Sequence, residues 1–278
     1  MVLERAQVGS TTEKGLSKPA LRVGAEQKMF ESIYKKYWQF GFKTRLYDLM
    51  APEAYMDSLQ RAVDLLDMDE KGLLLDAGCG SGLLLRLLKL KPGTGIAYVG
   101  TDFLFAGLGA LQGKARKLPA GVKAICFQAD FTGQLPLREN IFDAAVAHFC
   151  VYTMGAAKKR INAIKNLRDA LKPDGTLVIV NPSVTYDPGR IIKSSLASLK
   201  GKGGGLRVFC SQWLIYPLTL KFGLRYIETQ LKKDNWRAYT QDEFCDEIRA
   251  GGFDVIQVEN IYADSAYLAV CKPSAASQ

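Results

Sequence analysis

A strand that ends in an acid and runs into three alternate glycines constrains this chain more than any other feature. The apolar residues 73–75 are followed by Asp76 and then by Gly78, Gly80 and Gly82. Closely spaced leucines come next, as in a buried or amphipathic helix. The pattern predicts a buried parallel strand, a tight turn and a helix start. In an open α/β sheet, ligands bind at the carboxyl ends of strands, and glycines let the backbone approach them.

The spacing of the glycines argues against a dinucleotide site. Leu83 stands where the third glycine of G-x-G-x-x-G belongs. Asp76 would repel a pyrophosphate but attract an ammonium group. Asp102 ends the next apolar run, at the spacing expected of an acid that accepts hydrogen bonds from ribose hydroxyls. Together these positions predict a cationic ligand that carries a ribose.

At these positions the sequence resembles the class I S-adenosylmethionine-dependent methyltransferases. Residues 76–82 match the family's first motif, and Asp102 matches its ribose-binding acid. Asp130 follows the third expected strand, where the family has an acid that contacts the adenine amino group. The resemblance covers about residues 70–182 and 239–273. It implies S-adenosylmethionine as the cofactor, bound by Asp76, Gly78, Cys79, Gly80, Gly82, Asp102, Phe103, Asp130 and Phe131.

An aromatic-rich segment precedes this motif. We expect a loose polar tail over residues 1–27 and a helical cover over residues 28–70. The helices either cover the edge of the sheet or close over cofactor and substrate, in which case Tyr37 or Tyr47 reaches the cofactor. Tyr47 and Asp48 resemble a tyrosine–aspartate pair common before the first motif in quinone and lipid methyltransferases. The nearest resemblance is therefore to this small-molecule branch.

Strands and helices alternate along the core, which predicts a doubly wound α/β fold with a mostly parallel sheet. Strands are expected at residues 73–78, 97–102, 123–129, 142–149, 176–180, 253–262 and 266–271, and helices at about 52–66, 82–90, 104–117, 156–171 and 240–251. Residues 172–175 have the composition of a turn. The short link before the last strand permits only an antiparallel pair. The resemblance likewise implies a seven-stranded Rossmann-like sheet with an antiparallel last strand, in a core of residues 71–182 and 239–273.

Residues 183–238 interrupt this order, and the resemblance implies that a segment in this place determines the substrate. The segment holds ten Lys and Arg against three Asp and Glu, or +7 of the chain's net +9. A glycine-rich link at residues 201–205 precedes an apolar stretch with Trp213 and Tyr216. We expect a mobile cap whose apolar side, with Trp213 and Tyr216, meets a lipophilic substrate or an anionic membrane surface. The alternative is a capping subdomain with an ordinary solvated basic face.

His148 is the only histidine of the chain, and we expect it at the carboxyl end of the fourth strand, facing the ligand crevice. The ordinary pKa of histidine, about 6.5, suits a general base at neutral pH. His148 is therefore a candidate base, and Tyr152 on the same loop is a weaker one. Both are also candidates for lining the substrate site. The structural alternative for His148 is a hydrogen-bonded wall residue.

Composition limits the class of protein. With 278 residues and 48% hydrophobic content, the chain can bury about three quarters of its surface as a globular protein. Its six cysteines are scattered without a C-x-x-C pair, which favours reduced thiols over a zinc site or disulfides. The first residues lack the pattern of a secretory signal, and no long uncharged apolar run occurs. We therefore expect a cytoplasmic protein that is at most peripheral to a membrane.

The sequence thus predicts a methyltransferase that moves a methyl group from S-adenosylmethionine to an oxygen, nitrogen or activated carbon of a small, lipophilic acceptor. A nucleic-acid methyltransferase is the main alternative, because the chain is basic. The fourth strand, however, ends in Ala-His-Phe-Cys, without the [DNS]-P-P-[YFW] sequence in which the amino methylases of nucleic acids resemble one another. An NAD-dependent oxidoreductase and a noncatalytic cofactor-binding module are the other classes left open. The acceptor's identity and the oligomeric state are not predicted.

Overall fold

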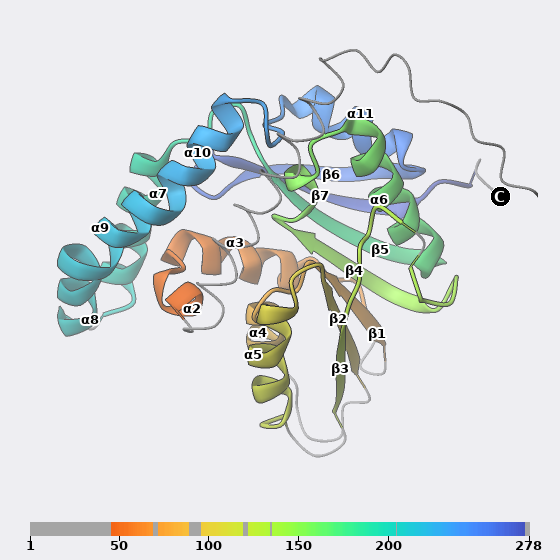
Figure 1. Cartoon of the computed structure of the whole chain (residues 1–278), viewed down its shortest axis with the longest axis horizontal. Coiled ribbons are helices and arrows are strands. Elements are labelled where there is room, and N and C mark those ends of the chain that lie inside the picture. The colour runs from red at the N-terminus through yellow and green to blue at the C-terminus, as the bar shows by residue number, and fades with distance from the viewer. Residues whose placement is uncertain are drawn as a thin grey trace, which may run out of the picture.

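Seven strands form one sheet with helices on both faces (Figure 1). The structure is a computed structural model, and it describes residues 46–68, 72–88, 96–118, 122–133, 135–203 and 205–275, with side chains from Asp48 onward. The strands are β1 (Leu73–Ala77), β2 (Ala97–Asp102), β3 (Lys123–Gln128), β4 (Phe142–His148), β5 (Leu171–Pro182), β6 (Phe253–Ile261) and β7 (Ala266–Pro273). Their order in the sheet is β3-β2-β1-β4-β5-β7-β6.

The strand directions confirm the predicted fold class. The pairs β1–β2, β2–β3, β1–β4 and β4–β5 are parallel, whereas β7 is antiparallel to both β5 and β6. The strand order reverses between β1 and β4. Such a switch point leaves a crevice outside the carboxyl ends of the two strands, which is where the glycines after β1 and His148 at the end of β4 lie.

The helices of the described chain alternate with these strands. They are α2 (Leu46–Met50), α3 (Glu53–Asp64), α4 (Leu83–Leu87), α5 (Phe105–Ala115), α6 (Ala157–Ala170), α7 (Pro188–Gly201), α8 (Gly205–Cys210), α9 (Tyr216–Leu218), α10 (Arg225–Lys232) and α11 (Gln241–Ala250). A 3-10 turn, η1 (Val151–Thr153), follows β4. Two π-helical segments, η2 (Ser211–Ile215) and η3 (Thr219–Leu224), connect α8, α9 and α10.

The central strands are buried on both faces, as parallel strands between two helical layers must be. Successive residues of a strand point to opposite faces, so Leu75 and Leu177 pack in one apolar cluster with α6 and α11, whereas Leu74 and Val178 pack in a second cluster. The second cluster holds residues of α3, α4, α5 and α7. Figure 1 shows the same division, with α6 and α11 on one side of the sheet and α4 and α5 on the other.

The predicted turn at residues 172–175 is wrong, because these residues form a bulge inside β5. Leu171 pairs with Phe142, and the next pair joins Thr176 to Ala144. Between these two pairs the chain advances by five residues in β5 but by only two residues in β4. Pro173 is tolerated there because a bulge does not require every backbone N–H to join the ladder.

The start and end of α11 follow the predicted capping signals. The Thr240 hydroxyl accepts a hydrogen bond from the Glu243 backbone, and the Glu243 carboxylate accepts one from the Thr240 N–H. Two backbone donors that the helix leaves unpaired are thereby satisfied. Gly251 caps the other end, and β6 begins after Gly252, whose φ is +86°.

The segment before the core is described only over residues 46–68, whereas the inserted segment 183–238 is described except for residue 204. The expected tail and most of the expected cover, with Tyr37, lie outside the described residues, as does the side chain of Tyr47. Helices α2 and α3 are the described part of that cover. The inserted residues form a hairpin of α7 and the long helical run from α8 to α10, which projects from one end of the sheet in Figure 1. Among the described helices, none is both long and apolar enough to cross a membrane.

Candidate functional site

The glycine loop after β1 adopts a conformation that side chains disfavour. Gly78, Gly80 and Gly82 have φ values of +74°, +51° and +79°. The backbone N–H groups of Gly78 and Cys79 both donate to the Thr101 carbonyl oxygen, at 2.8 and 3.0 Å. A Cβ on Gly78 would lie 2.4 Å from the Cβ of Cys150. The loop is therefore fixed against the ends of β2 and β4, with its backbone close to its neighbours.

Asp102, the predicted ribose acceptor, holds two loops together at the end of β2. One carboxylate oxygen accepts from the Gly80 N–H at 2.9 Å, and the other accepts from the Leu104 N–H at 2.7 Å. Burial raises the pKa of this carboxyl above its ordinary value, while the two backbone donors oppose the shift. Each carboxylate oxygen can accept a further hydrogen bond, so the backbone contacts leave capacity for hydroxyl donors.

Asp76 is a buried acid at the end of β1. Its carboxylate accepts a hydrogen bond from the Tyr98 hydroxyl at 2.5 Å. Burial raises the pKa of Asp76 to about 7, the Tyr98 hydrogen bond opposes that rise, and nearby Asp102 adds to it. A cation placed beside Asp76 would favour its ionised form.

A contact between the glycine loop and α2 was not predicted. The Ser81 hydroxyl donates to one carboxylate oxygen of Asp48, and the Lys114 ammonium donates to the other at 2.6 Å. Lys114 also donates to the Ser81 carbonyl oxygen at 2.7 Å. Asp48 thus ties α2 and α5 to the loop. The signal in the sequence was the Tyr47–Asp48 pair, which resembles a pair that precedes the first motif in related enzymes. That resemblance did not indicate Ser81 or Lys114 as the partners of Asp48.

The other predicted cofactor residues lie after β2 and β3. Asp130 is exposed, and its carboxylate accepts from the backbone N–H and the hydroxyl of Thr132, both at 2.8 Å. Phe131 is buried in the core, whereas Phe103 is 40% exposed. Cys79 is buried within the glycine loop.

His148 lies at the end of β4, as predicted, and contacts α3 directly. The Ser58 hydroxyl oxygen is 3.0 Å from His148 Nε2 and donates its own hydrogen to the Tyr55 carbonyl oxygen at 2.8 Å. With the single Ser58 hydrogen given to Tyr55, Nε2 of the neutral ring would carry the proton and donate to Ser58. The other ring nitrogen, Nδ1, is then an acceptor. It is buried and has no hydrogen-bond partner among the described residues.

The environment of His148 overturns the assumption of an ordinary pKa. Burial lowers the pKa of the imidazole to about 3, because the charged form loses its hydration. The ring is therefore neutral at neutral pH. The prediction of a general base assumed a pKa near 6.5; burial makes the imidazole a weaker base than that, and it leaves Nδ1 as a neutral hydrogen-bond acceptor.

Aromatic rings enclose His148. The rings of Tyr55 and Phe149 meet it edge to face, at centroid distances of 4.9 and 4.7 Å. Phe149 in turn packs against Tyr262 at 5.1 Å and Tyr152 at 6.2 Å. The φ of Phe149 is +52°, a region that is strained for a bulky residue and is found most often at functional sites. The wall around Nδ1 is thus mostly apolar.

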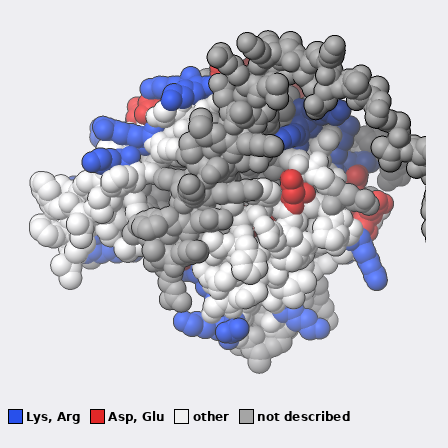
Figure 2. All heavy atoms as spheres, in the orientation of Figure 1, with Lys and Arg blue, Asp and Glu red and all other residues white. Residues whose placement is uncertain are grey.

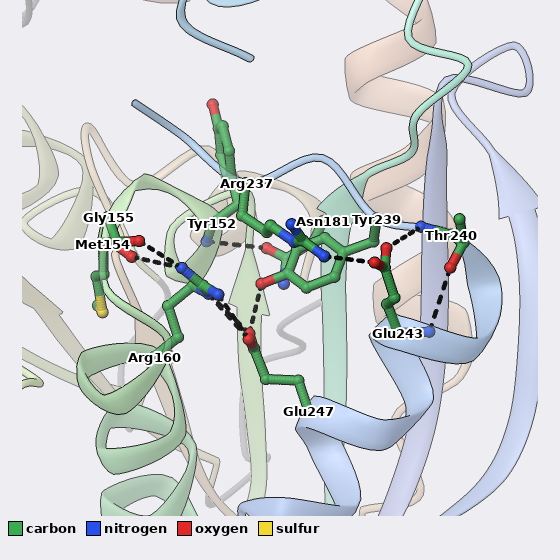
Figure 3. A network of polar contacts seen from close by, with 10 residues as sticks. All are labelled: Tyr152, Met154, Gly155, Arg160, Asn181, Arg237, Tyr239, Thr240, Glu243 and Glu247. Carbon is green, nitrogen blue, oxygen red and sulfur yellow. Dashed lines mark hydrogen bonds and ion pairs between the residues drawn. The ribbon is translucent and has the colours of Figure 1, made fainter. Parts of the chain in front are cut away.

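Tyr152, the weaker candidate base, is held in η1 behind this wall. It is buried, its backbone N–H donates to the Asn181 side chain at 3.3 Å, and its carbonyl accepts from the Arg237 N–H at 2.9 Å. Its ring meets Trp236 edge to face at 5.5 Å. In Figure 3 the Tyr152 side chain points away from the polar network beneath it.

That polar network fixes the loop that follows His148. Arg160 donates to the carbonyl oxygens of Met154 and Gly155 at 3.1 and 2.7 Å, and its other nitrogens pair with the Glu247 carboxylate at 2.8 to 3.0 Å (Figure 3). The Tyr239 hydroxyl also donates to Glu247. One guanidinium thereby joins η1, α6 and α11.

Trp213 and Tyr216, the predicted substrate residues of the cap, lie in η2 and α9. Trp213 is 67% exposed on the outer surface of the hairpin. Tyr216 is buried, and its hydroxyl accepts from the Glu53 backbone N–H at 3.1 Å, which joins the hairpin to the start of α3. Neither ring is among the described rings that contact His148. Within the described part of the chain, no cluster of three or more His, Cys, Asp or Glu side chains could hold a metal ion.

Comparison with known proteins identifies the part of the chain that carries this site. Residues 75–179 match the family model of a methyltransferase domain. The chain carries a methyltransferase domain. The matched segment contains Asp76, the glycine loop, Asp102, Asp130 and His148.

One relative by sequence and two solved structures are similar to this methyltransferase chain. An uncharacterized protein of Methanocaldococcus jannaschii is 23% identical over 198 residues, which are 68% of this chain and 71% of that protein. A proposed methyltransferase in complex with the Trm112 methyltransferase activator of Haloferax volcanii has a TM-score of 0.57 and 14% identity, over 87% of this chain and 97% of that one. A SAM-dependent methyltransferase of Aquifex aeolicus has a TM-score of 0.53 and 14% identity, over 82% and 97%. The structural likenesses concern the fold alone.

The predicted enzyme class and cofactor, a methyltransferase that uses S-adenosylmethionine, are confirmed by the domain match. The site of the methyltransferase domain fits this cofactor on physical grounds. Asp76, a buried acid with a raised pKa, would gain from a neighbouring ammonium group such as the cofactor's. The glycine loop holds its positive φ values, and packs against Cys150 and Leu111, because it carries no side chains at Gly78 and Gly82.

Proposed function

We propose that this methyltransferase transfers the methyl group of S-adenosylmethionine to an oxygen, nitrogen or activated carbon of a small, lipophilic acceptor. One observation carries the choice of acceptor. His148 Nδ1 is a buried, neutral hydrogen-bond acceptor without a described partner, enclosed by aromatic rings at the carboxyl edge of the sheet. A small molecule with an apolar body and one hydroxyl or amine donor would satisfy both features.

The cofactor half of the site uses the residues around the glycine loop. Asp76 would pair with the ammonium group, Asp102 would accept the ribose hydroxyls, and Asp130 would accept the adenine amino group. Hydrogen bonds to charged groups contribute roughly 1.5 to 3 kcal/mol each. When bound, the cofactor supplies a methyl group activated by the positive charge of its sulfonium.

The acceptor half would use His148 to position the reacting atom. A hydroxyl or amine of the acceptor would donate to Nδ1, and Ser58 would favour the tautomer that leaves this nitrogen unprotonated. As the methyl group moves to the acceptor and S-adenosylhomocysteine leaves, the acceptor's proton would pass to Nδ1 and then to solvent. The aromatic rings would exclude water from the apolar body of the acceptor. Because the leaving group is already activated, alignment is the main contribution of the protein, and such positioning can supply roughly 7 to 11 kcal/mol.

The test is transfer of an isotopically labelled methyl group. We expect the purified protein, incubated with labelled S-adenosylmethionine and an organic extract of cells, to yield a labelled small molecule detectable by mass spectrometry. His148→Gln keeps a donor toward Ser58 but removes Nδ1, so it should reduce transfer while cofactor affinity, measured by calorimetry, stays the same. Label that appears in RNA and in no small molecule would favour the nucleic-acid alternative. Cofactor binding without transfer to any acceptor would favour the noncatalytic alternative.

A further inference from the structure

The long helical run of the hairpin exposes an unusual number of large apolar side chains. Their exposed fractions range from 41% for Leu218 to 78% for Leu206. We call this set the apolar face; it consists of Leu206, Phe209, Trp213, Leu214, Leu218 and Phe222. Monomeric proteins rarely expose contiguous apolar patches of this kind without a binding role.

Two π-helical segments, η2 and η3, interrupt the helical run that carries these exposed side chains. Trp213 and Leu218 are five residues apart, a step that would rotate them to different sides of an α-helix with 3.6 residues per turn. The first part of this step lies in η2, whose wider π turn reduces the rotation. The opposite side of the run is formed by buried residues, Ser211, Tyr216, Thr219 and Leu224. Such π segments are often found at functional sites.

The hairpin is also strongly basic. Between Asp187 and Glu228 the chain has seven Lys and Arg residues and no Asp or Glu. Lys221 and Arg225 are exposed next to the apolar face, and Lys221 lies over the Phe222 ring at 5.3 Å. In the described structure neither of these two cations forms an ion pair. In Figure 2 the end of the molecule that carries α8 and α9 is mostly uncharged, with Lys and Arg side chains at its border.

Contacts on the inner side of the hairpin fix the direction in which the apolar face points. Lys202 and Arg207 pair with the Glu53 carboxylate at 2.7 and 3.0 Å. The Thr219 hydroxyl donates to the Met50 carbonyl oxygen at 2.8 Å, and Ser195 accepts from the Ala54 N–H at 3.0 Å. Because these contacts hold the hairpin on α3, the apolar face points away from the body of the protein.

We propose that the apolar face docks on a bilayer surface that contains anionic phospholipids. Trp213, Phe209 and Phe222 enter the boundary between head groups and acyl chains, and Lys221 and Arg225 contact the lipid phosphates. Exposed aromatic and aliphatic side chains with flanking cations and no acid form the pattern of an interfacial helix. A membrane is favoured over an acidic protein because the centre of the surface is apolar and the cations lie at its border.

The test is vesicle binding without methyl donor or acceptor, so it is independent of the acceptor proposed above. Sedimentation is measured with vesicles of phosphatidylcholine alone and with vesicles containing about 30% phosphatidylglycerol. We expect binding to the anionic vesicles at about 0.1 M salt and its loss at about 1 M salt. Both Phe209→Ser with Trp213→Ser and Lys221→Glu with Arg225→Glu should weaken binding at least about tenfold.

Two matched controls distinguish binding by the apolar face from nonspecific binding through any exposed apolar side chain or any positive charge. Ile256→Ser removes an equally exposed apolar side chain on β6, and Lys158→Glu with Lys159→Glu makes the same charge change on α6. Both should bind vesicles like the parent protein. Retained affinity for S-adenosylmethionine in all variants shows that they are folded.

A second measurement covers the case in which a serine variant fails to fold. Brominated lipids should quench the tryptophan emission of the parent protein, and Trp213→Phe should abolish that quenching. Absence of binding to anionic vesicles would overturn the proposal, as would equal losses in the control variants. If the parent protein does not bind vesicles but forms a dimer, and Trp213→Ser converts that dimer to a monomer, the apolar face is instead a contact with a second copy of the chain.

Discussion

Ser58 lies between His148 and the carbonyl oxygen of Tyr55. The Ser58 oxygen is 3.0 Å from His148 Nε2 and 2.8 Å from the Tyr55 carbonyl oxygen, and a Ser58 hydrogen given to that carbonyl favours the tautomer with the ring proton on Nε2. Ser58 and Tyr55 both belong to α3, whereas His148 ends β4. The helix before the methyltransferase core therefore determines which nitrogen of the core's only histidine can accept a hydrogen bond.

His148 should make the stability of the protein depend on pH. Its pKa is about 3 in the folded protein and near 6.5 when exposed, so the unfolded state binds more protons between these values. Stability is therefore lost as pH falls through this window. For His148 alone we expect a loss of about 2 kcal/mol between about pH 7.5 and pH 5. His148→Gln should lack this contribution, which urea unfolding of both proteins at the two pH values measures.

Asp76→Asn should separate the stability of the free protein from its affinity for the cofactor. In the free protein the carboxyl has a pKa of about 7 instead of its ordinary value. Asp76 therefore binds its proton more tightly in the folded state than in the unfolded state. As pH rises from about 4 to about 7, Asp76 increasingly destabilises the folded protein. We expect Asp76→Asn to melt higher than the parent at pH 8, with no such gain at pH 4. Its affinity for S-adenosylmethionine should fall roughly 10- to 100-fold; unchanged affinity by calorimetry would remove Asp76 from the ammonium site.

Asp102→Ala should weaken both the fold and cofactor binding, because the variant loses the acceptor for the Gly80 and Leu104 N–H groups. We expect roughly 1 to 3 kcal/mol of destabilisation. Asp102→Asn retains one acceptor oxygen and should recover part of the stability. Asp130→Ala, which removes an exposed acid, is the matched comparison, and it should alter cofactor affinity with little change in unfolding. Equal cofactor affinity in Asp102→Ala and the parent would mean that the ribose binds elsewhere.

The glycine loop predicts opposite effects for two glycine-to-alanine changes. Gly78→Ala places a Cβ in a left-handed conformation, 2.4 Å from the Cys150 Cβ, and should cost roughly 2 to 5 kcal/mol. Gly113 lies in α5 with no atom within 4 Å of an added Cβ. Gly113→Ala should stabilise by about 0.5 to 1 kcal/mol. Chemical denaturation compares both variants, and a Gly78→Ala protein as stable as the parent would contradict the close approach of the loop.

The parts of the fold that follow local rules could be predicted from the sequence. Three alternate glycines after the strand that ends in Asp76 predicted the turn, because only glycine readily adopts their positive φ. The apolar runs alternating with helices predicted the parallel sheet, and the short link before β7 required an antiparallel last strand. The capping box at Thr240 fixed the start of α11. Each of these features depends on residues that are close to one another in the sequence, so that the sequence alone was enough to predict it.

The parts that were missed depend on contacts between distant residues. The bulge at residues 172–175 arises from pairing between β4 and β5, which a local turn signal does not contain. The pKa of His148 reflects burial by Tyr55, Ser58 and Phe149, two of which come from α3. The Tyr216 hydroxyl accepts a hydrogen bond from the backbone N–H of Glu53, 163 residues away, a contact that the sequence did not indicate. No local pattern in the sequence indicates these partners.

The buried Arg160–Glu247 pair should be necessary for the loop that carries Tyr152. Removing one partner leaves the other charge buried, which costs about 3 to 5 kcal/mol. Arg160→Met should therefore destabilise by about this amount and also free the Met154 and Gly155 carbonyl oxygens that hold η1. Glu247→Gln should cost less, because Tyr239 and Arg160 can still contact the amide oxygen. In the double variant the losses should not add, since neither charge remains; additive losses in urea unfolding would show that the two side chains act independently.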